Sequence, residues 1–123
     1  MREVIDHVVD HVPGVMGALV SSSDGFTLAA RLPVAFDGDA AGLGAMAAAS
    51  VGLSNRLVGT LGGAPATVSQ HRSADAQVSI VAIAHVAALT LLAEPDADTE
   101  QLAAVGREVA AGLERLFRGA AAV

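Results

Sequence analysis

The spacing of apolar residues predicts a helix at each end of the chain and a long one in the middle. Near the N-terminus, apolar residues recur every three or four positions until Pro13-Gly14, where the pattern stops, at Val4, Ile5, Val8, Val9 and Val12. Residues 39–61 and 98–117 show the same periodicity. Asp98 and Gln101 resemble a capping box at the start of the last helix.

Shorter segments alternate between apolar and polar residues and predict five strands. Segments 15–21 and 26–31 flank Asp24-Gly25, a dipeptide typical of tight hairpin turns. Segments 66–72, 77–82 and 88–93 follow the middle helix and are joined by short turns, so their strands must be antiparallel. The order α-β-β-α-β-β-β-α predicts an α+β domain with one five-stranded antiparallel sheet and three helices. We expect this single domain to span residues 1–118, with a frayed tail at 119–123.

The middle helix carries two distinct lines of residues. One is an apolar stripe formed by Leu43, Met46, Leu53, Leu57 and Leu61. The other is made of small residues four apart, Gly44, Ala48 and Gly52, which Asn55 and Gly59 roughly continue. A glycine inside a helix costs about 1 kcal/mol relative to alanine, so a close approach of another backbone is expected to offset it. We therefore predict a helix crossing at a twofold interface, and the alternative is an alanine-rich helix packed on its own sheet.

Composition narrows the possible functions of this domain. Apolar residues make up 53% of the 123 positions and the net charge is −6, with seven scattered arginines and no lysine. Nucleic-acid binding needs a basic stripe, which is missing, and the absence of cysteine excludes disulfides and zinc–thiolate sites. The longest apolar region, 78–93, is interrupted by polar residues and is shorter than a membrane span of about 20 residues. It predicts a buried hairpin in a cytoplasmic protein that does not insert into membranes.

Three patterns could suggest chemistry, but each has a simpler explanation. His7 and His11 are four apart on one helix, yet two ligands do not make a zinc site, and solvated histidines explain them. Ser21, Ser22 and Ser23 beside Asp24 lack a nucleophile elbow and form a polar turn. A phosphate-binding P-loop needs a lysine, which this chain does not have. We predict no catalytic residues, no metal and no cofactor, and hence no enzyme.

The chain resembles the roadblock / dynein light chain seven family. Members open with a helix that ends in a Pro-Gly step, followed by a hairpin whose strands have a gly-ala-leu-val and a leu-ala character. The matching segments here are Val12-Pro13-Gly14-Val15, Gly17-Ala18-Leu19-Val20, Asp24-Gly25 and Leu28-Ala29. The Ala-rich helix, the three-strand meander and the closing helix match the remaining predicted elements.

This resemblance implies regulation without chemistry. Family members form dimers in which two sheets join edge to edge and the central helices pair, and they act on Ras-like GTPases as activators, exchange factors or scaffolds. Bacterial members are of the gliding-motility B type or of an actinobacterial type encoded beside a sensor-kinase-like protein and a GTP-binding protein. The Ala- and Arg-rich, Lys-free composition suits the actinobacterial type. We therefore expect a homodimer that binds a Ras-like small GTPase, with a sensor-kinase-like protein as a further partner.

The interaction sites are expected on the middle helix and the strand that follows it. The predicted dimer interface consists of Gly44, Ala48, Gly52, Gly59 and Val68, and the predicted partner-binding residues are Ala48, Asn55 and Arg56. Arg56 could act as an arginine finger, but a solubilising charge on a helix otherwise poor in charge explains it more simply. We therefore predict that Arg56 contacts a partner and has no catalytic role. Two other functions stay open: a structural scaffold with no effect on nucleotide turnover, and a small-ligand sensor.

Overall fold

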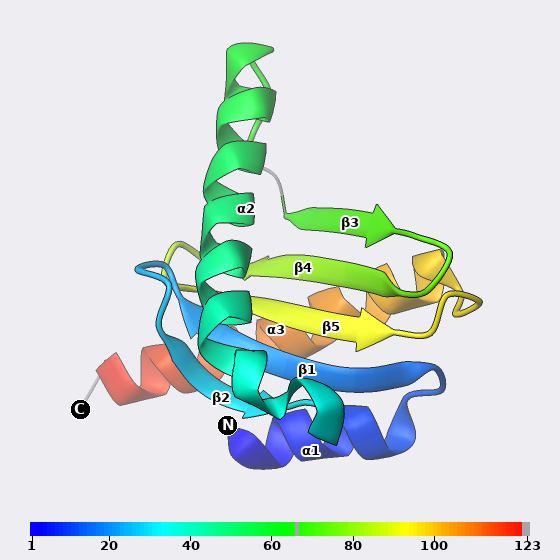
Figure 1. The fold of residues 1–123 in the computed structure, drawn as a ribbon. Coiled ribbons are helices and arrows are strands. Elements are labelled where there is room, and N and C mark those ends of the chain that lie inside the picture. The colour runs from blue at the N-terminus through cyan, green and yellow to red at the C-terminus, as the bar shows by residue number, and fades with distance from the viewer. Residues whose placement is uncertain (66, 122–123) are drawn as a thin grey trace.

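Five strands form one antiparallel sheet with helices on both faces (Figure 1). The computed structural model describes residues 1–65 and 67–121. Its elements are α1 (Arg2–His11), β1 (Val15–Ser22), β2 (Thr27–Arg31), the 3-10 helix η1 (Val34–Asp39), α2 (Ala40–Thr60), β3 (Val68–Arg72), β4 (Gln77–Ile83), β5 (Ala87–Ala93) and α3 (Thr99–Ala121). The predicted fold class and the order α-β-β-α-β-β-β-α are confirmed.

The boundaries differ from the sequence-based expectation at two places. A 3-10 helix, η1, leads directly into α2, so Asp39 has a helix-like backbone and its side chain makes no capping hydrogen bond. The helix α3 continues to Ala121, since alanine favours helix, so the expected tail is helical up to that residue. Residues 122–123 and the expected strand start at residue 66 lie outside the described residues.

The strands are arranged in the order β2-β1-β5-β4-β3, which leaves β2 and β3 at the two edges. The pairing of β1 with β2 shifts register, so that Thr27 lies opposite Ser21 while Ala29 lies opposite Val20. Thr27 and Ala29 therefore lie on opposite faces of the sheet, because this irregularity turns the strand over at Leu28. Leu28 is left about half exposed.

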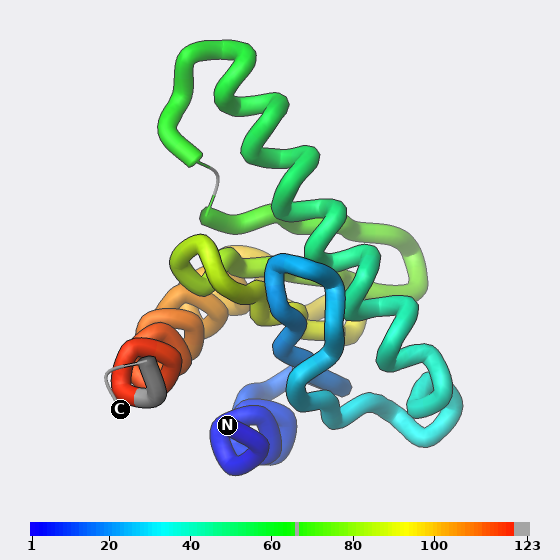
Figure 2. Tube along the Cα trace, turned by 90° about the vertical axis from the view of Figure 1, so that its left-hand side faces the viewer, coloured from blue at the N-terminus to red at the C-terminus, as the bar shows by residue number. Residues whose placement is uncertain are grey.

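The two faces of the sheet are packed differently. Helices α1 and α3 cover one face, where large aliphatic residues such as Ile5, Leu89 and Leu113 form the main core (Figure 2). Helix α2 crosses the other face, with η1 beside its first turn, and the buried cluster there is small: Ala47, Ile80 and Ala88. The α2 face therefore contributes less buried apolar area, and less stability, than the other face.

Polar side chains fix α1 and α3 to the sheet. The buried Gln77 places its amide nitrogen 2.6 Å from the carbonyl oxygen of Ala97, and its amide oxygen accepts a 2.8 Å hydrogen bond from the Thr99 hydroxyl. The Asp98 carboxylate accepts a hydrogen bond from the backbone amide of Gln101, as the capping pattern predicts. At the other end, the Arg31 guanidinium lies 2.7 Å from Asp10, and this hydrogen bond holds the pKa of the Asp10 carboxyl below its ordinary value.

Two threonines give opposite predictions for stability. Thr90 is 3% exposed and its hydroxyl has no hydrogen-bond partner within residues 1–65 and 67–121, whereas the Thr99 hydroxyl is paired with Gln77. Replacing an unsatisfied buried hydroxyl with a methyl group removes a desolvation penalty, so Thr90→Val should raise the free energy of unfolding by about 1 kcal/mol. Thr99→Val should lower it by about 1 kcal/mol or more. Urea unfolding of both variants measures the difference, and equal effects would contradict this account.

Candidate functional site

Helix α2 is seated on the sheet at a point where residue 44 has no side chain. A Cβ atom at Gly44 would overlap the Thr27 side chain and would lie 3.4 Å from the Cβ of Ser21. The Thr27 hydroxyl donates a 2.8 Å hydrogen bond to the carbonyl of Ala40, which fixes the first turn of α2 to β2. The close approach of a second backbone that the glycine predicts is therefore observed at Gly44, but the neighbouring backbone belongs to the chain's own sheet and not to a second protomer. Gly44 is buried there and is not available to a second chain.

Further along, small and hydroxyl side chains continue this contact. Ala47 is 2% exposed and packs with Ile80 and Ala88, and Val51 borders the same cluster. The Ser54 hydroxyl lies 2.7 Å from the Ser69 hydroxyl on β3. The inward face of α2 is thus the face of small residues, with the helix close to the strands along its first half.

The apolar stripe predicted from the sequence lies on the surface instead. Met46, Leu53, Leu57 and Leu61 have exposed fractions of 62%, 59%, 61% and 88%. Helical periodicity identifies an apolar face but does not tell which neighbour covers it. Here the sheet packs against the face that carries Gly44, Ala47 and Ser54. A row of large exposed apolar side chains on one helix indicates a surface for another protein.

The last turns of α2 project beyond the sheet. Figure 1 shows α2 crossing the strands and continuing past β3, so that its last turns have no strand beneath them. Leu57 and Leu61 lie in this projecting part, which we call the α2 tip (residues 55–61). A helix end that projects from its own core needs a covering partner to bury its apolar side chains.

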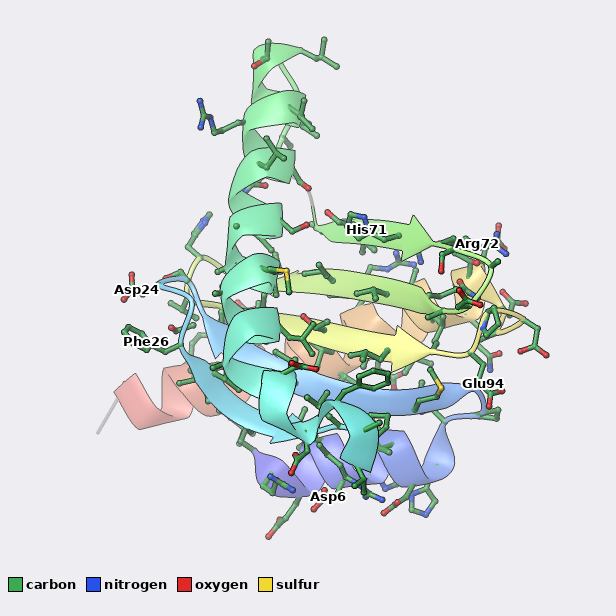
Figure 3. The ribbon with its side chains drawn as sticks, viewed as in Figure 1. Asp6, Asp24, Phe26, His71, Arg72 and Glu94 are labelled. Atoms are coloured by element: carbon green, nitrogen blue, oxygen red, sulfur yellow. The ribbon has the colours of Figure 1, made fainter. Side chains whose placement is uncertain are left out.

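An apolar trough runs along the side of α2 that faces His71 (Figure 3). It consists of two adjoining hollows of about 470 and 290 Å³, which share Leu43, Met46 and Val78. The larger hollow reaches η1 and the centre of the sheet, and the smaller reaches β3. We call this the α2 trough, and its further lining includes Phe36, His71, Ile80, Thr90 and Leu92.

The opposite side of α2 faces the two hairpin turns. A small hollow of about 190 Å³ lies there, lined by Ala48, Gly52 and Asn55 of α2 and by Ser22 and His85, among others. Asp24 in the β1–β2 turn lies on this side, across α2 from His71 (Figure 3). The β4–β5 turn beside it holds Ala84 with a φ of 50°, which is a strained value for a residue other than glycine.

Comparison of the sequence with models of known protein families identifies the family of this chain. The model of the Roadblock/LC7 domain matches residues 1–93, which include α2, both sheet edges and the trough. The chain belongs to the Roadblock/LC7 family.

Solved structures of low sequence identity share this roadblock fold. MglB from Myxococcus xanthus is 12% identical with a TM-score of 0.85, covering 96% of this chain and 94% of that one. A Roadblock/LC7 domain from Streptomyces avermitilis is 16% identical with a TM-score of 0.86, covering 96% and 98%. The gliding protein MglB from Thermus thermophilus is 19% identical with a TM-score of 0.79, covering 92% and 84%. No curated protein sequence matches the chain.

The remaining predicted site residues of this roadblock domain are not all in one place. Ala48 and Asn55 are half-buried beside the small hollow, and Arg56 is exposed next to them. Outside its own helix and among the described residues, no atom lies within 4 Å of a Cβ built at Gly52 or Gly59. Val68 is half-buried at the start of β3 and pairs with Val81.

The histidines and serines singled out in the sequence make contacts within the protomer. The rings of His7 and His11 stack with centroids 4.3 Å apart, and no group of three or more potential metal ligands occurs in the described part of the chain. Ser21 is buried under α2. The Ser22 hydroxyl accepts a hydrogen bond from the backbone amide of Phe26 inside the β1–β2 turn. Among residues 1–65 and 67–121, no helix combines the length and apolar character needed to cross a bilayer.

The two kinds of glycine in α2 predict opposite mutational effects. Gly44→Ala should lower the free energy of unfolding by about 1–3 kcal/mol, because the added methyl group overpacks against Thr27. Gly52→Ala should raise it by about 1 kcal/mol, because alanine favours helix and nothing described in the protomer obstructs it. Chemical denaturation of both variants at low protein concentration measures these changes. A Gly44→Ala variant as stable as the original chain would show that α2 is not seated as described.

Proposed function

We propose that this chain is a non-enzymatic regulator that homodimerises and binds a Ras-like small GTPase, altering the nucleotide state or the localisation of that GTPase in bacterial signalling. The observation that carries the proposal is the exposed apolar face of α2, where Met46, Leu53 and Leu57 are 62%, 59% and 61% exposed. A surface of this kind on a roadblock domain supports a protein partner, since the family acts on Ras-like GTPases. Such a GTPase is cytoplasmic, and there we expect the chain to act.

The edge strand β3 supports the homodimer. Its pairing with β4 is regular from Val68 to Arg72, so the outer edge is straight and suited to pair with a second β3. The opposite edge strand, β2, is protected by the register irregularity at Leu28 and by the ion pairs between Arg31 and α1. A MglB structure, 20% identical with a TM-score of 0.84, is described as a tetrameric arrangement, so that relative associates.

Helix α2 also supports the GTPase contact. Arg56 is the only charged residue in the sequence of α2 and is exposed, on a chain whose net charge is −6. With Ala48 and Asn55 it forms a small surface that combines one positive charge, an amide and little steric bulk. Arg56 serves here as a contact for the partner, while the hydrolytic chemistry stays with residues of the GTPase itself.

The proposal is tested with the purified chain and a Ras-like GTPase encoded next to it. We expect a measurable complex and a change in GTP hydrolysis or nucleotide release. Arg56→Ala should weaken binding about tenfold, as expected for an interfacial arginine, whereas Arg107→Ala, on α3 behind the sheet, should leave it unchanged. Binding with unaltered turnover would instead support a scaffold, and no binding at all would contradict the proposal.

A further inference from the structure

The larger hollow of the α2 trough has the size and the lining of a small-molecule site. Its volume of about 470 Å³ falls within the range of about 300–1,000 Å³ that is usual for ligand pockets. The walls are η1 and the first two turns of α2, and the floor is formed by β1, β4 and β5. Figure 1 shows η1 and the start of α2 standing over β1. Most of the lining is apolar and includes Met16, Phe36, Leu43, Met46, Val78 and Leu92.

The protomer does not fill this hollow. No residue of η1 is buried, and Phe36 and Met46 stay 49% and 62% exposed although both line the hollow. Gly42 lines it too, and a Cβ atom built there would meet no described atom within 4 Å outside its own helix. A glycine costs up to about 1 kcal/mol relative to alanine in a helix, and no contact in the protomer offsets this cost at Gly42. An apolar molecule in the hollow would bury these side chains and occupy the space beside the Gly42 backbone.

The mouth of the hollow carries negative charge. Asp39 lines the hollow, and its carboxylate neither caps α2 nor forms a salt bridge with any described residue. Asp37 and Asp75 are exposed, and each is next in sequence to a residue that lines the hollow. No arginine or histidine occurs among the described lining residues. A cleft bordered by one sign of charge attracts ligands of the opposite sign, so this hollow favours a cation.

The arginine at this end of the sheet faces away from the hollow. Arg72 lies directly opposite Gln77 in the pairing of β3 with β4, and residues that are directly opposite share one face of a sheet. The Gln77 side chain accepts a hydrogen bond from Thr99 at the start of α3. Arg72 therefore lies on the α3 face, and it does not neutralise the carboxylates on the α2 face.

We propose that the larger hollow binds a small organic cation with an apolar body, of the class of the alkylamines. The apolar body lies between α2 and the sheet, against Leu43 and Leu92, and the ammonium group lies at the mouth beside Asp39. Phe36 adds an aromatic ring to the lining, and such rings also attract cations. A small molecule fits this hollow better than a protein segment does, because η1 and α2 wall it as well as the sheet.

This site is separate from the surfaces of the proposed function. None of its described lining residues belongs to β3 or to the α2 tip. The small hollow beside Asn55 lies on the other side of α2. The inference therefore does not rest on the homodimer or on the GTPase, and it gives the chain a response to a small molecule in addition to proteins.

Three ligands with the same octyl chain test the size and the charge of the site. Octylammonium, 1-octanol and octanoate are titrated separately into the isotope-labelled full chain, and binding is followed by NMR. Octylammonium should bind saturably and about tenfold more tightly than octanoate, because attraction of one charge and repulsion of the other each change the affinity about threefold at an exposed carboxylate. The affinity for 1-octanol should lie between the two. The amide signals of Gly42, Leu43 and Val78 should shift.

Matched substitutions locate the binding. Asp39→Asn should lower the affinity for octylammonium about threefold and leave that for 1-octanol unchanged, whereas Asp24→Asn, across α2 from the trough (Figure 3), should change neither. Gly42→Leu should abolish the binding of both ligands, because the new side chain occupies the hollow. Its circular dichroism spectrum should stay unchanged, since the Cβ atom meets open space. Gly119→Leu makes the same change at an open position of α3 and should not affect binding.

The contrary outcomes are distinct. Failure of octylammonium to saturate, equal affinities for octylammonium and octanoate, or binding that survives Gly42→Leu would each overturn the inference. So would a leucine–lysine peptide that shifts the same amides when octylammonium does not, since the occupant would then be a protein segment. Octylammonium should leave the oligomeric state unchanged in analytical ultracentrifugation, and dissociation of a dimer would identify a second copy as the occupant and overturn the inference. A chain that binds octylammonium but no GTPase would support this inference and contradict the proposed function.

Discussion

The contact between Gly44 and β2 fixes the rotation of α2 about its own axis, and the surface of the molecule depends on that rotation. With Gly44 against Thr27 and the Ala40 carbonyl bound by the Thr27 hydroxyl, the first half of the helix cannot turn without a steric clash. Ala47 and Val51 follow Gly44 at helical spacing and must also face the strands. The larger residues of α2 are thereby directed to its sides and outer face. The close contact of Gly44 with β2 is thus the reason that Leu53 and Leu57 form an exposed apolar surface on α2.

The two faces of the sheet have different physical roles. The face under α1 and α3 buries leucine, isoleucine and valine, and it supplies most of the hydrophobic stabilisation of the protomer. The face under α2 buries a few small side chains and leaves a trough beside the helix. A protomer that is stabilised mainly by the core under α1 and α3 can leave the α2 face of the sheet partly uncovered for association with another protein. The low aromatic content of 2% fits this division, because small side chains allow backbones to approach closely.

The sequence predicts the elements well and the environment of each face less well. Periodicity, the Pro13-Gly14 step and the Asp98 cap depend on local interactions, so element order and the start of α3 follow from the residues alone. The exposure of Leu53 and Leu57 depends on which side of α2 meets the sheet, a tertiary choice made at Gly44. The helix η1 lies in the connection between β2 and α2, and the register shift at Leu28 lies beside the β1–β2 turn; neither segment has a periodic pattern that would predict it.

The two sides of α2 are parts of one stiff element, so the proposed dimer and the proposed GTPase complex cannot be independent. The Ser54–Ser69 bond ties the helix to the edge strand that would pair in the dimer, and Gly44 ties it to the opposite edge of the sheet. Any shift of α2 relative to the strands moves both of its sides together. In the proposed complex, a partner that shifts α2 on one side would therefore change the affinity for a partner on the other, and thermodynamic linkage makes such coupling reciprocal. The proposed regulator can in this way make its affinity for a GTPase depend on its own association.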